Sequence, residues 1–144
     1  MQRDRFAVAR RWLPGAEADL TLGRNIASDF AARAAFHAQR AAEMALKGAI
    51  IAATDDHPTT HSCGTLVREL RAVPIAVPDD VAAAATTLDL YYLTSRYPDA
   101  VGDADPLDVV MPDDVAVALE RAARVVRFAS ATIDALCQAA PAER

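Results

Sequence analysis

A long alanine-rich segment in the first half of the chain constrains the fold most strongly. No proline interrupts residues 29–53, and nearly every residue there is a good helix former. The segment therefore predicts one long helix from about Asp29 to Ala53, capped by Ser28 or Asp29. Small residues spaced alternately by four and three form one stripe of this helix: Ala38, Ala42, Ala45, Ala49 and Ala52. Because a methyl group holds helix backbones apart very little, the stripe predicts close packing against other helices.

A second stripe of the same predicted helix is charged and consists of Arg33, Arg40, Glu43 and Lys47. In one interpretation it is a solvated face, on which Glu43 and Lys47 form an i,i+4 pair that contributes roughly 0.2–0.5 kcal/mol. In the other interpretation it is a polar site inside a helical bundle or at a dimer groove. This stripe is the only part of the helix that could carry chemistry.

The most regular pattern in the chain lies in its last third. Pro112 at a first helical position, followed by Asp113 and Asp114, begins a helix that Pro141 ends. Its apolar residues recur at alternating spacings of four and three: Val115, Leu119, Ala122, Val126, Ala129, Ile133 and Leu136. A sustained seam of this kind is typical of a helix packed in a bundle, so Leu119 and Val126 are expected to be buried.

Shorter patterns fill the rest of the chain, and no run of residues reads as a strand. They are a basic arm that is frayed or begins a helix (Met1–Arg11), a helix from Trp12 to about Asn25, a short helix capped by Thr60 or Ser62, a helix from Asp79 or Asp80 to Arg96, and an acidic loop from Ala100 to Val110. The sequence thus predicts an all-α fold, an antiparallel bundle of four to five helices. We expect one domain over residues 1–144, with its core at about 12–137.

Composition excludes several classes of function. The net charge of −5 argues against general binding to a phosphate backbone, although a local basic patch is compatible with it. The two cysteines, Cys63 and Cys137, lack metal-ligand spacing, so we expect free thiols in a reducing compartment and no metal site. No glycine-rich phosphate loop is present, and no cofactor is expected. No apolar run reaches the roughly 18 residues of a membrane span, so the expectation is a cytoplasmic protein with no membrane partner.

Three ordered blocks of the sequence resemble the HEPN family, which is named for nucleotide-binding domains of higher eukaryotes and prokaryotes. Residues 36–47, FHAQRAAEMALK, resemble the core segment of that family. Thr60-His61 followed by Leu66 is similar to a second block, and YLTSRYPD at residues 92–99 to a third. Trp12 with Ala18-Asp19-Leu20 fits the family's first helix.

The resemblance implies a helical bundle that commonly forms a symmetric homodimer. Many members act beside a minimal nucleotidyltransferase in toxin–antitoxin-like pairs, which makes such a protein an expected partner. In the family's bundle the long helix lies close to the third block, so Glu43, Lys47, Arg96 and Asp99 are expected to form one polar cluster with Tyr97 at its edge. In one interpretation Arg96 pairs with a carboxylate and the cluster is structural. In the other, Arg96 binds a phosphate and Tyr97 stacks on a base.

Some HEPN members are metal-independent ribonucleases with an Arg-x(4–6)-His motif, and none of His37, His57 and His61 has that spacing here. The predicted function is therefore a non-catalytic binding module for a nucleotide or RNA. Its candidate ligand-binding residues are Lys47, Arg96, Tyr97 and Arg40. The alternative is a metal-independent ribonuclease with a non-standard Arg/His site. In that case His37 and His61 are the candidate catalytic residues. The competing interpretation is that each histidine has a structural role only.

Overall fold

The computed structural model describes residues 4–94 and 110–141, and within these ranges the chain forms α-helices and no strand. The helices are α1 (Arg5–Arg10), α2 (Trp12–Ile26), α3 (Ala31–Thr54), α4 (Cys63–Ala72), α5 (Asp79–Leu88), α6 (Leu90–Thr94) and α8 (Pro112–Ala139). The all-α prediction is confirmed, and the two longest helices begin and end close to the residues expected from the sequence. In the described ranges, no helix combines the length and the apolar character that crossing a membrane requires.

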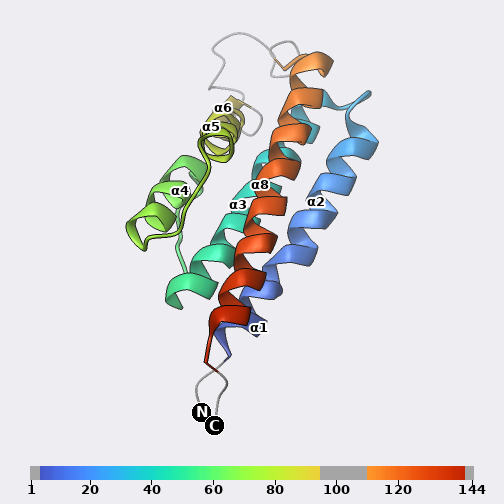
Figure 1. Cartoon of the computed structure of the whole chain (residues 1–144). Coiled ribbons are helices and arrows are strands. Elements are labelled where there is room, and N and C mark those ends of the chain that lie inside the picture. Colours follow the sequence, from blue (N-terminus) through green and yellow to red (C-terminus); the bar gives the residue numbers. More distant parts are fainter. Residues whose placement is uncertain (1–3, 95–109, 142–144) are drawn as a thin grey trace.

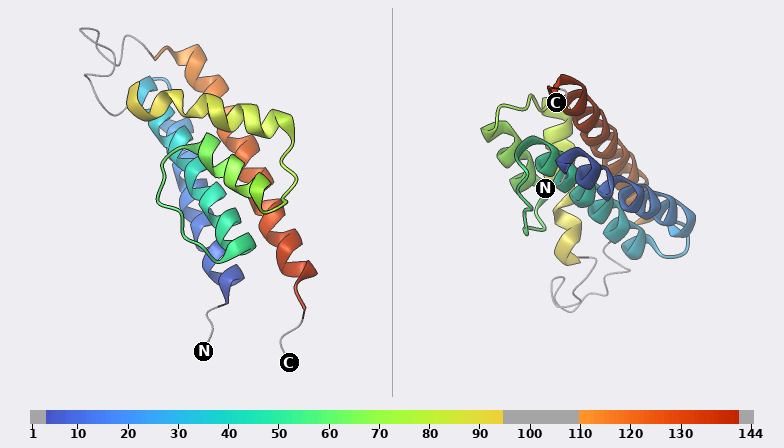
Figure 2. Two further views of the ribbon diagram at one scale, coloured as in Figure 1. Left: turned by 90° about the vertical axis from the view of Figure 1, so that its left-hand side faces the viewer. Right: turned by 90° about the horizontal axis from the view of Figure 1, so that it is seen from below.

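Helix α3 is the central element of the bundle. Helices α2 and α8 run along it, as Figure 1 shows, and α1 and α4 also pack against it. Helices α5 and α6 run across the long helices, which Figure 2 shows most clearly in its left view. The crossing brings the end of α5 and the start of α6 to the face of α3 that also receives α4.

The alanine stripe of α3 is entirely inside the fold. Ala38, Ala42, Ala45, Ala49 and Ala52 are all 0% exposed. The close packing against other helices that the stripe predicts is therefore confirmed, and the stripe leaves no apolar surface outside the fold.

The seam of α8 lies in the same core, and the prediction that Leu119 and Val126 are buried is confirmed. Leu119 packs against α2 at Gly23, where its Cδ2 atom would lie 2.8 Å from an added Cβ. Small residues on α2 and α3 thus let α8 approach both helices closely.

Residues Arg5–Arg10 of the N-terminal arm form a short helix, which is one of the two expectations for this segment. Asp4 caps α1 by accepting a hydrogen bond from the backbone N–H of Phe6 at 2.9 Å. Helix α1 then approaches α3 at Gly48, where an added Cβ would lie 3.0 Å from the carbonyl oxygen of Ala9. Only glycine permits this contact without displacement of one of the two backbones.

Two local predictions are wrong. The N-cap of α3 is Phe30 and not Ser28 or Asp29, because the backbone N–H groups of Asp29 and Phe30 still bond to the carbonyl of Ile26 in a tight corner after α2. The helix expected from Asp79 to Arg96 is interrupted at Asp89, which separates α5 from α6. The short helix α4 does begin after Ser62, one of the two predicted caps, whose Oγ accepts a bond from Thr65 N at 3.1 Å.

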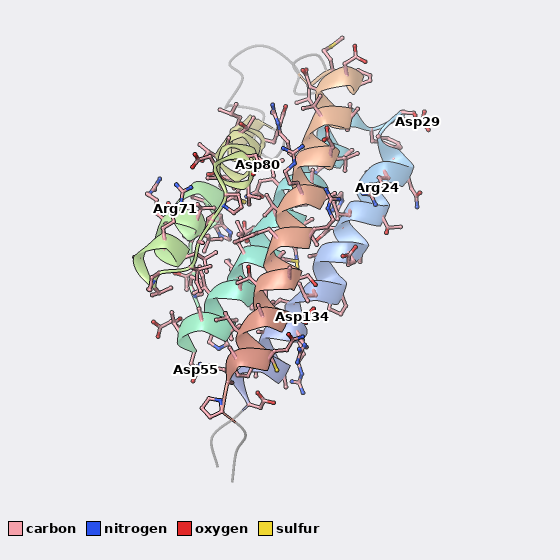
Figure 3. All side chains as sticks on the ribbon, viewed as in Figure 1. Arg24, Asp29, Asp55, Arg71, Asp80 and Asp134 are labelled. Atoms are coloured by element: carbon pink, nitrogen blue, oxygen red, sulfur yellow. The ribbon has the colours of Figure 1, made fainter. Side chains whose placement is uncertain are left out.

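Charged side chains cover the outside of the bundle. Arg24, Asp80 and Asp134, labelled in Figure 3, are all exposed. In the described part of the chain, the charged residues that are buried are Glu43 and Lys47.

Candidate functional site

Glu43 is the centre of a buried polar network on α3. It and Lys47 are each only 7% exposed, and Lys47 Nζ donates to Glu43 Oε2 at 3.2 Å. Gln39, which is 0% exposed, donates from Nε2 to the Glu43 carboxylate at 3.4 Å and to the backbone carbonyl of His61 at 2.8 Å. The interpretation of Glu43 and Lys47 as part of a solvated face is therefore wrong, and the pair is a closed ion pair inside the bundle.

His61 joins this network from the loop before α4. Its Nδ1 lies 3.3 Å from both carboxylate oxygens of Glu43, and its ring stacks on Tyr92 with centroids 5.3 Å apart and planes at 17°. The His61 side chain is nevertheless 55% exposed. The ring is thus held on one edge and one face while much of its surface stays open to solvent.

Asp89 fixes the loop that carries His61. Its carboxylate accepts hydrogen bonds from Ser62 Oγ at 2.9 Å, Cys63 N at 2.7 Å and Gly64 N at 2.9 Å. These donors lie at the N-terminus of α4, where backbone N–H groups have no partner within the helix and a negative charge is favourable. Asp89 therefore caps α4 from another element, and this contact coincides with the break between α5 and α6.

A groove of about 470 Å³ opens beside these residues, and the lining that the structure describes is Thr60, His61, Ser62, Asp89 and Tyr92. It combines two aromatic rings, the three hydroxyl groups of Thr60, Ser62 and Tyr92, and the carboxylate of Asp89. Cys63 lies just behind it, and burial raises the pKa of this thiol well above its usual range, so it stays protonated and is not a nucleophile.

A second polar cluster lies between α3 and α2. His37 Nδ1 is 2.8 Å from Asp19 Oδ1, and Arg40 Nε is 3.3 Å from Asp19 Oδ2. Asp19 and His37 are mostly buried, with side chains 13% and 19% exposed, while Arg40 is 52% exposed. Two of the residues predicted from the sequence, His37 and Arg40, thus meet at a carboxylate that the prediction did not include.

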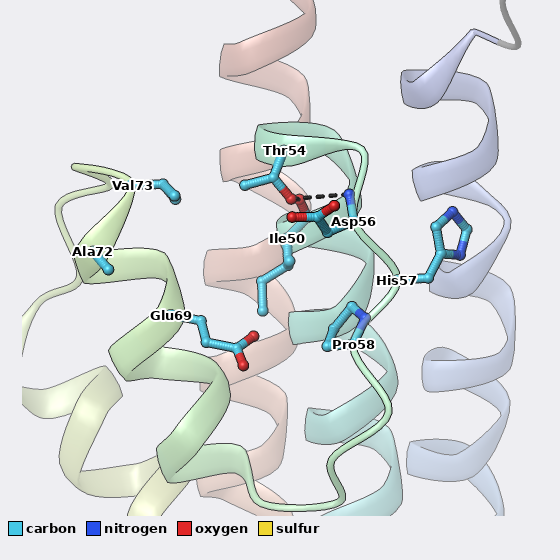
Figure 4. Close-up of a pocket in the computed structure, with 8 residues that line it drawn as sticks. All are labelled: Ile50, Thr54, Asp56, His57, Pro58, Glu69, Ala72 and Val73. Carbon is cyan, nitrogen blue, oxygen red and sulfur yellow. Dashed lines mark hydrogen bonds between the residues drawn. The ribbon is translucent and has the colours of Figure 1, made fainter.

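Figure 4 shows a separate cavity of about 330 Å³ between the end of α3, the loop after it and α4. Its lining is Ile50, Thr54, Asp56, His57, Pro58, Glu69, Ala72 and Val73. The carboxylates of Asp56 and Glu69 lie at its sides, and the His57 ring lies on the outer side of the loop. None of the candidate residues that the structure describes contributes to this cavity.

The structure describes two residues of the predicted cluster, Glu43 and Lys47. Glu43 and Lys47 lie together as expected, and His61, which was considered separately, completes their network. Arg96, Tyr97 and Asp99 lie outside the described residues. Gln39 and Asp89 were missed, although Gln39, Glu43 and Lys47 recur every four residues on a helix that is otherwise largely apolar, which is a signal of a buried polar stripe.

The chain matches the HEPN domain family over residues 9–132, and it belongs to that family. It is similar to a crystal structure of TT1696 from Thermus thermophilus, with 33% identity and a TM-score of 0.79, over 86% of this chain and 97% of that one. It is also similar to ST0689, described as an archaeal HEPN homologue, with 28% identity and a TM-score of 0.72, over 92% of this chain and 99% of that one. No curated protein matches the chain.

Proposed function

We propose that this HEPN protein is a non-catalytic binding module for a nucleotide or RNA, and that the groove beside His61 is its binding site. The observation that carries the proposal is the exposed His61 ring, which Glu43, Gln39 and Tyr92 hold in one orientation. Ordering a side chain before binding reduces the entropic cost of complex formation. Aromatic rings fixed in this way are platforms on which bases stack.

The test of this proposal is equilibrium dialysis with ATP and with a short single-stranded RNA. The unmodified protein is expected to bind at least one of the two ligands. His61→Ala is expected to weaken that binding about tenfold or more, because the ring that contacts the ligand is gone. His57→Ala is the matched control, since this exposed histidine lies outside the groove. Binding of neither ligand, or equal binding by His61→Ala, would contradict the proposal.

We further propose that the protein acts with a minimal nucleotidyltransferase in a toxin–antitoxin-like pair. The resemblance of its ordered sequence blocks to family members with such partners supports this. Sequencing the adjacent gene and co-purifying its product with this protein test the proposal. The expected result is a minimal nucleotidyltransferase that binds this chain.

The proposed assembly is a homodimer. The chain exposes large apolar side chains at the end of the bundle where α2 ends and α8 begins (Figure 1), namely Leu22, Phe30 and Met111. Burial of such residues on a self-complementary surface favours association. Sedimentation at micromolar concentration is expected to show a dimer. A species of 15.3 kDa alone would be evidence against it.

The cluster of Asp19, His37 and Arg40 favours a second candidate function, metal-independent RNA cleavage. Asp19 orients the His37 ring through Nδ1, which leaves Nε2 to accept a proton, and the partly exposed Arg40 can contact a phosphate. Under this alternative, RNA is cut in the presence of a metal chelator, and His37→Ala removes the activity while His57→Ala keeps it. If purified protein leaves RNA intact under these conditions, the alternative is wrong.

A further inference from the structure

We propose that the groove beside His61 receives the base of a nucleotide and not its phosphates, an inference that rests on the proposed function above. Both parts of a nucleotide could in principle occupy a groove of about 470 Å³. Three properties of the described lining distinguish between them: the polarity of its hydrogen-bonding groups, the orientation of its rings and the balance of its charges.

The first property is the hydrogen-bonding polarity of His61. A carboxylate can only accept, so the Nδ1 atom that faces Glu43 carries the hydrogen. In a neutral imidazole the remaining nitrogen, Nε2, is then an acceptor. In this neutral form, Nε2 pairs with the N–H groups of a base, whereas a phosphate oxygen needs a donor. The oxygens of Asp89 already accept three hydrogen bonds, and the hydroxyl groups of Thr60, Ser62 and Tyr92 both donate and accept, so this preference rests on His61.

The second property is the stack of His61 on Tyr92. The planes of the two rings differ by 17°, so they form a nearly parallel pair. Because the His61 side chain is 55% exposed, a third flat ring can extend the stack from the solvent side. Stacking of this kind accepts any base, since every base has a π-face. A phosphate group gains nothing from it.

The third property is charge. Among the described residues that line the groove, none is a lysine or arginine, and Asp89 is a carboxylate. The buried cation among the described residues is Lys47, whose side chain is 9% exposed and whose Nζ atom lies 3.2 Å from Glu43 Oε2. Among the described residues, a phosphate would have to break this pair or lie beside Asp89. A neutral base meets neither obstacle.

The test uses the imidazole NMR signals of the three histidines. Adenosine, ATP and inorganic tripolyphosphate are each titrated into the full chain. Adenosine is expected to shift the His61 signal but not the His57 signal, with an affinity within about threefold of that of ATP. Tripolyphosphate is expected to leave the His61 signal in place and not to displace adenosine. Equilibrium dialysis with adenosine compares two variants: His57→Ala, which lies outside the groove, is expected to bind like the unmodified protein, whereas His61→Ala is expected to lose about tenfold or more.

The results separate this inference from the proposed function. If ATP shifts the His61 signal, tripolyphosphate displaces ATP and adenosine has no effect, the groove binds phosphates, so the inference is wrong while nucleotide binding stands. If neither ATP nor adenosine nor single-stranded RNA shifts the His61 signal, both the inference and the proposed function are wrong.

Discussion

Glu43→Gln is expected to lower the free energy of unfolding by about 3–5 kcal/mol, because it leaves the charge of Lys47 buried without a partner. Both side chains are only 9% exposed, so water cannot replace the lost carboxylate. Chemical denaturation followed by circular dichroism measures the effect. The double variant Glu43→Gln with Lys47→Met removes both charges and is expected to recover most of the loss, since a buried ion pair itself adds little net stability.

The chain supplies a matched control for this experiment on α8. Glu120 and Arg124 also form an i,i+4 ion pair, with atoms 3.0 Å apart, but their side chains are 66% and 37% exposed. Glu120→Gln is therefore expected to cost less than about 1 kcal/mol. If Glu43→Gln proves as mild as Glu120→Gln, the pair on α3 is not shielded from water and the description of the buried network is wrong.

Leu119→Ala is expected to cost about 2–5 kcal/mol, which is the usual effect of removing a large side chain from a packed core. Leu119 fills the space between α8 and α2 at Gly23, so its truncation leaves a cavity that two helix backbones would have to move to close. Thermal or denaturant unfolding gives the difference in free energy.

Val117→Ala is the corresponding control on the same helix. Val117 is 43% exposed whereas Leu119 is 7% exposed, so its truncation is expected to change stability by no more than about 0.5 kcal/mol. A loss for Leu119→Ala as small as this would mean that the seam of α8 does not face the core.

The helices of this protein follow from local sequence patterns. Alternating spacings of four and three residues place Ala38 and Ala42 of α3, and Leu119 and Val126 of α8, on buried faces, as the structure confirms. Such spacings suffice because helix geometry alone decides which residues share a face.

The candidate site depends on contacts between distant residues, which local patterns do not contain. Asp89 interrupts the predicted helix after Asp79 and caps α4, whose first residues lie more than 20 positions earlier in the chain. Glu43 and Lys47 have the spacing of a surface pair, yet both are buried, and Gln39 and His61 join Glu43 in one network. Spacing alone could not distinguish these two environments.

A crystal structure of the protein with bound AMP is the most direct test of the groove as a nucleotide site. The expected result is an adenine ring packed against the His61 ring, with Lys47 still bound to Glu43 behind it. AMP bound at Asp19, His37 and Arg40, or in the cavity of Figure 4, with the groove beside His61 empty, would contradict this.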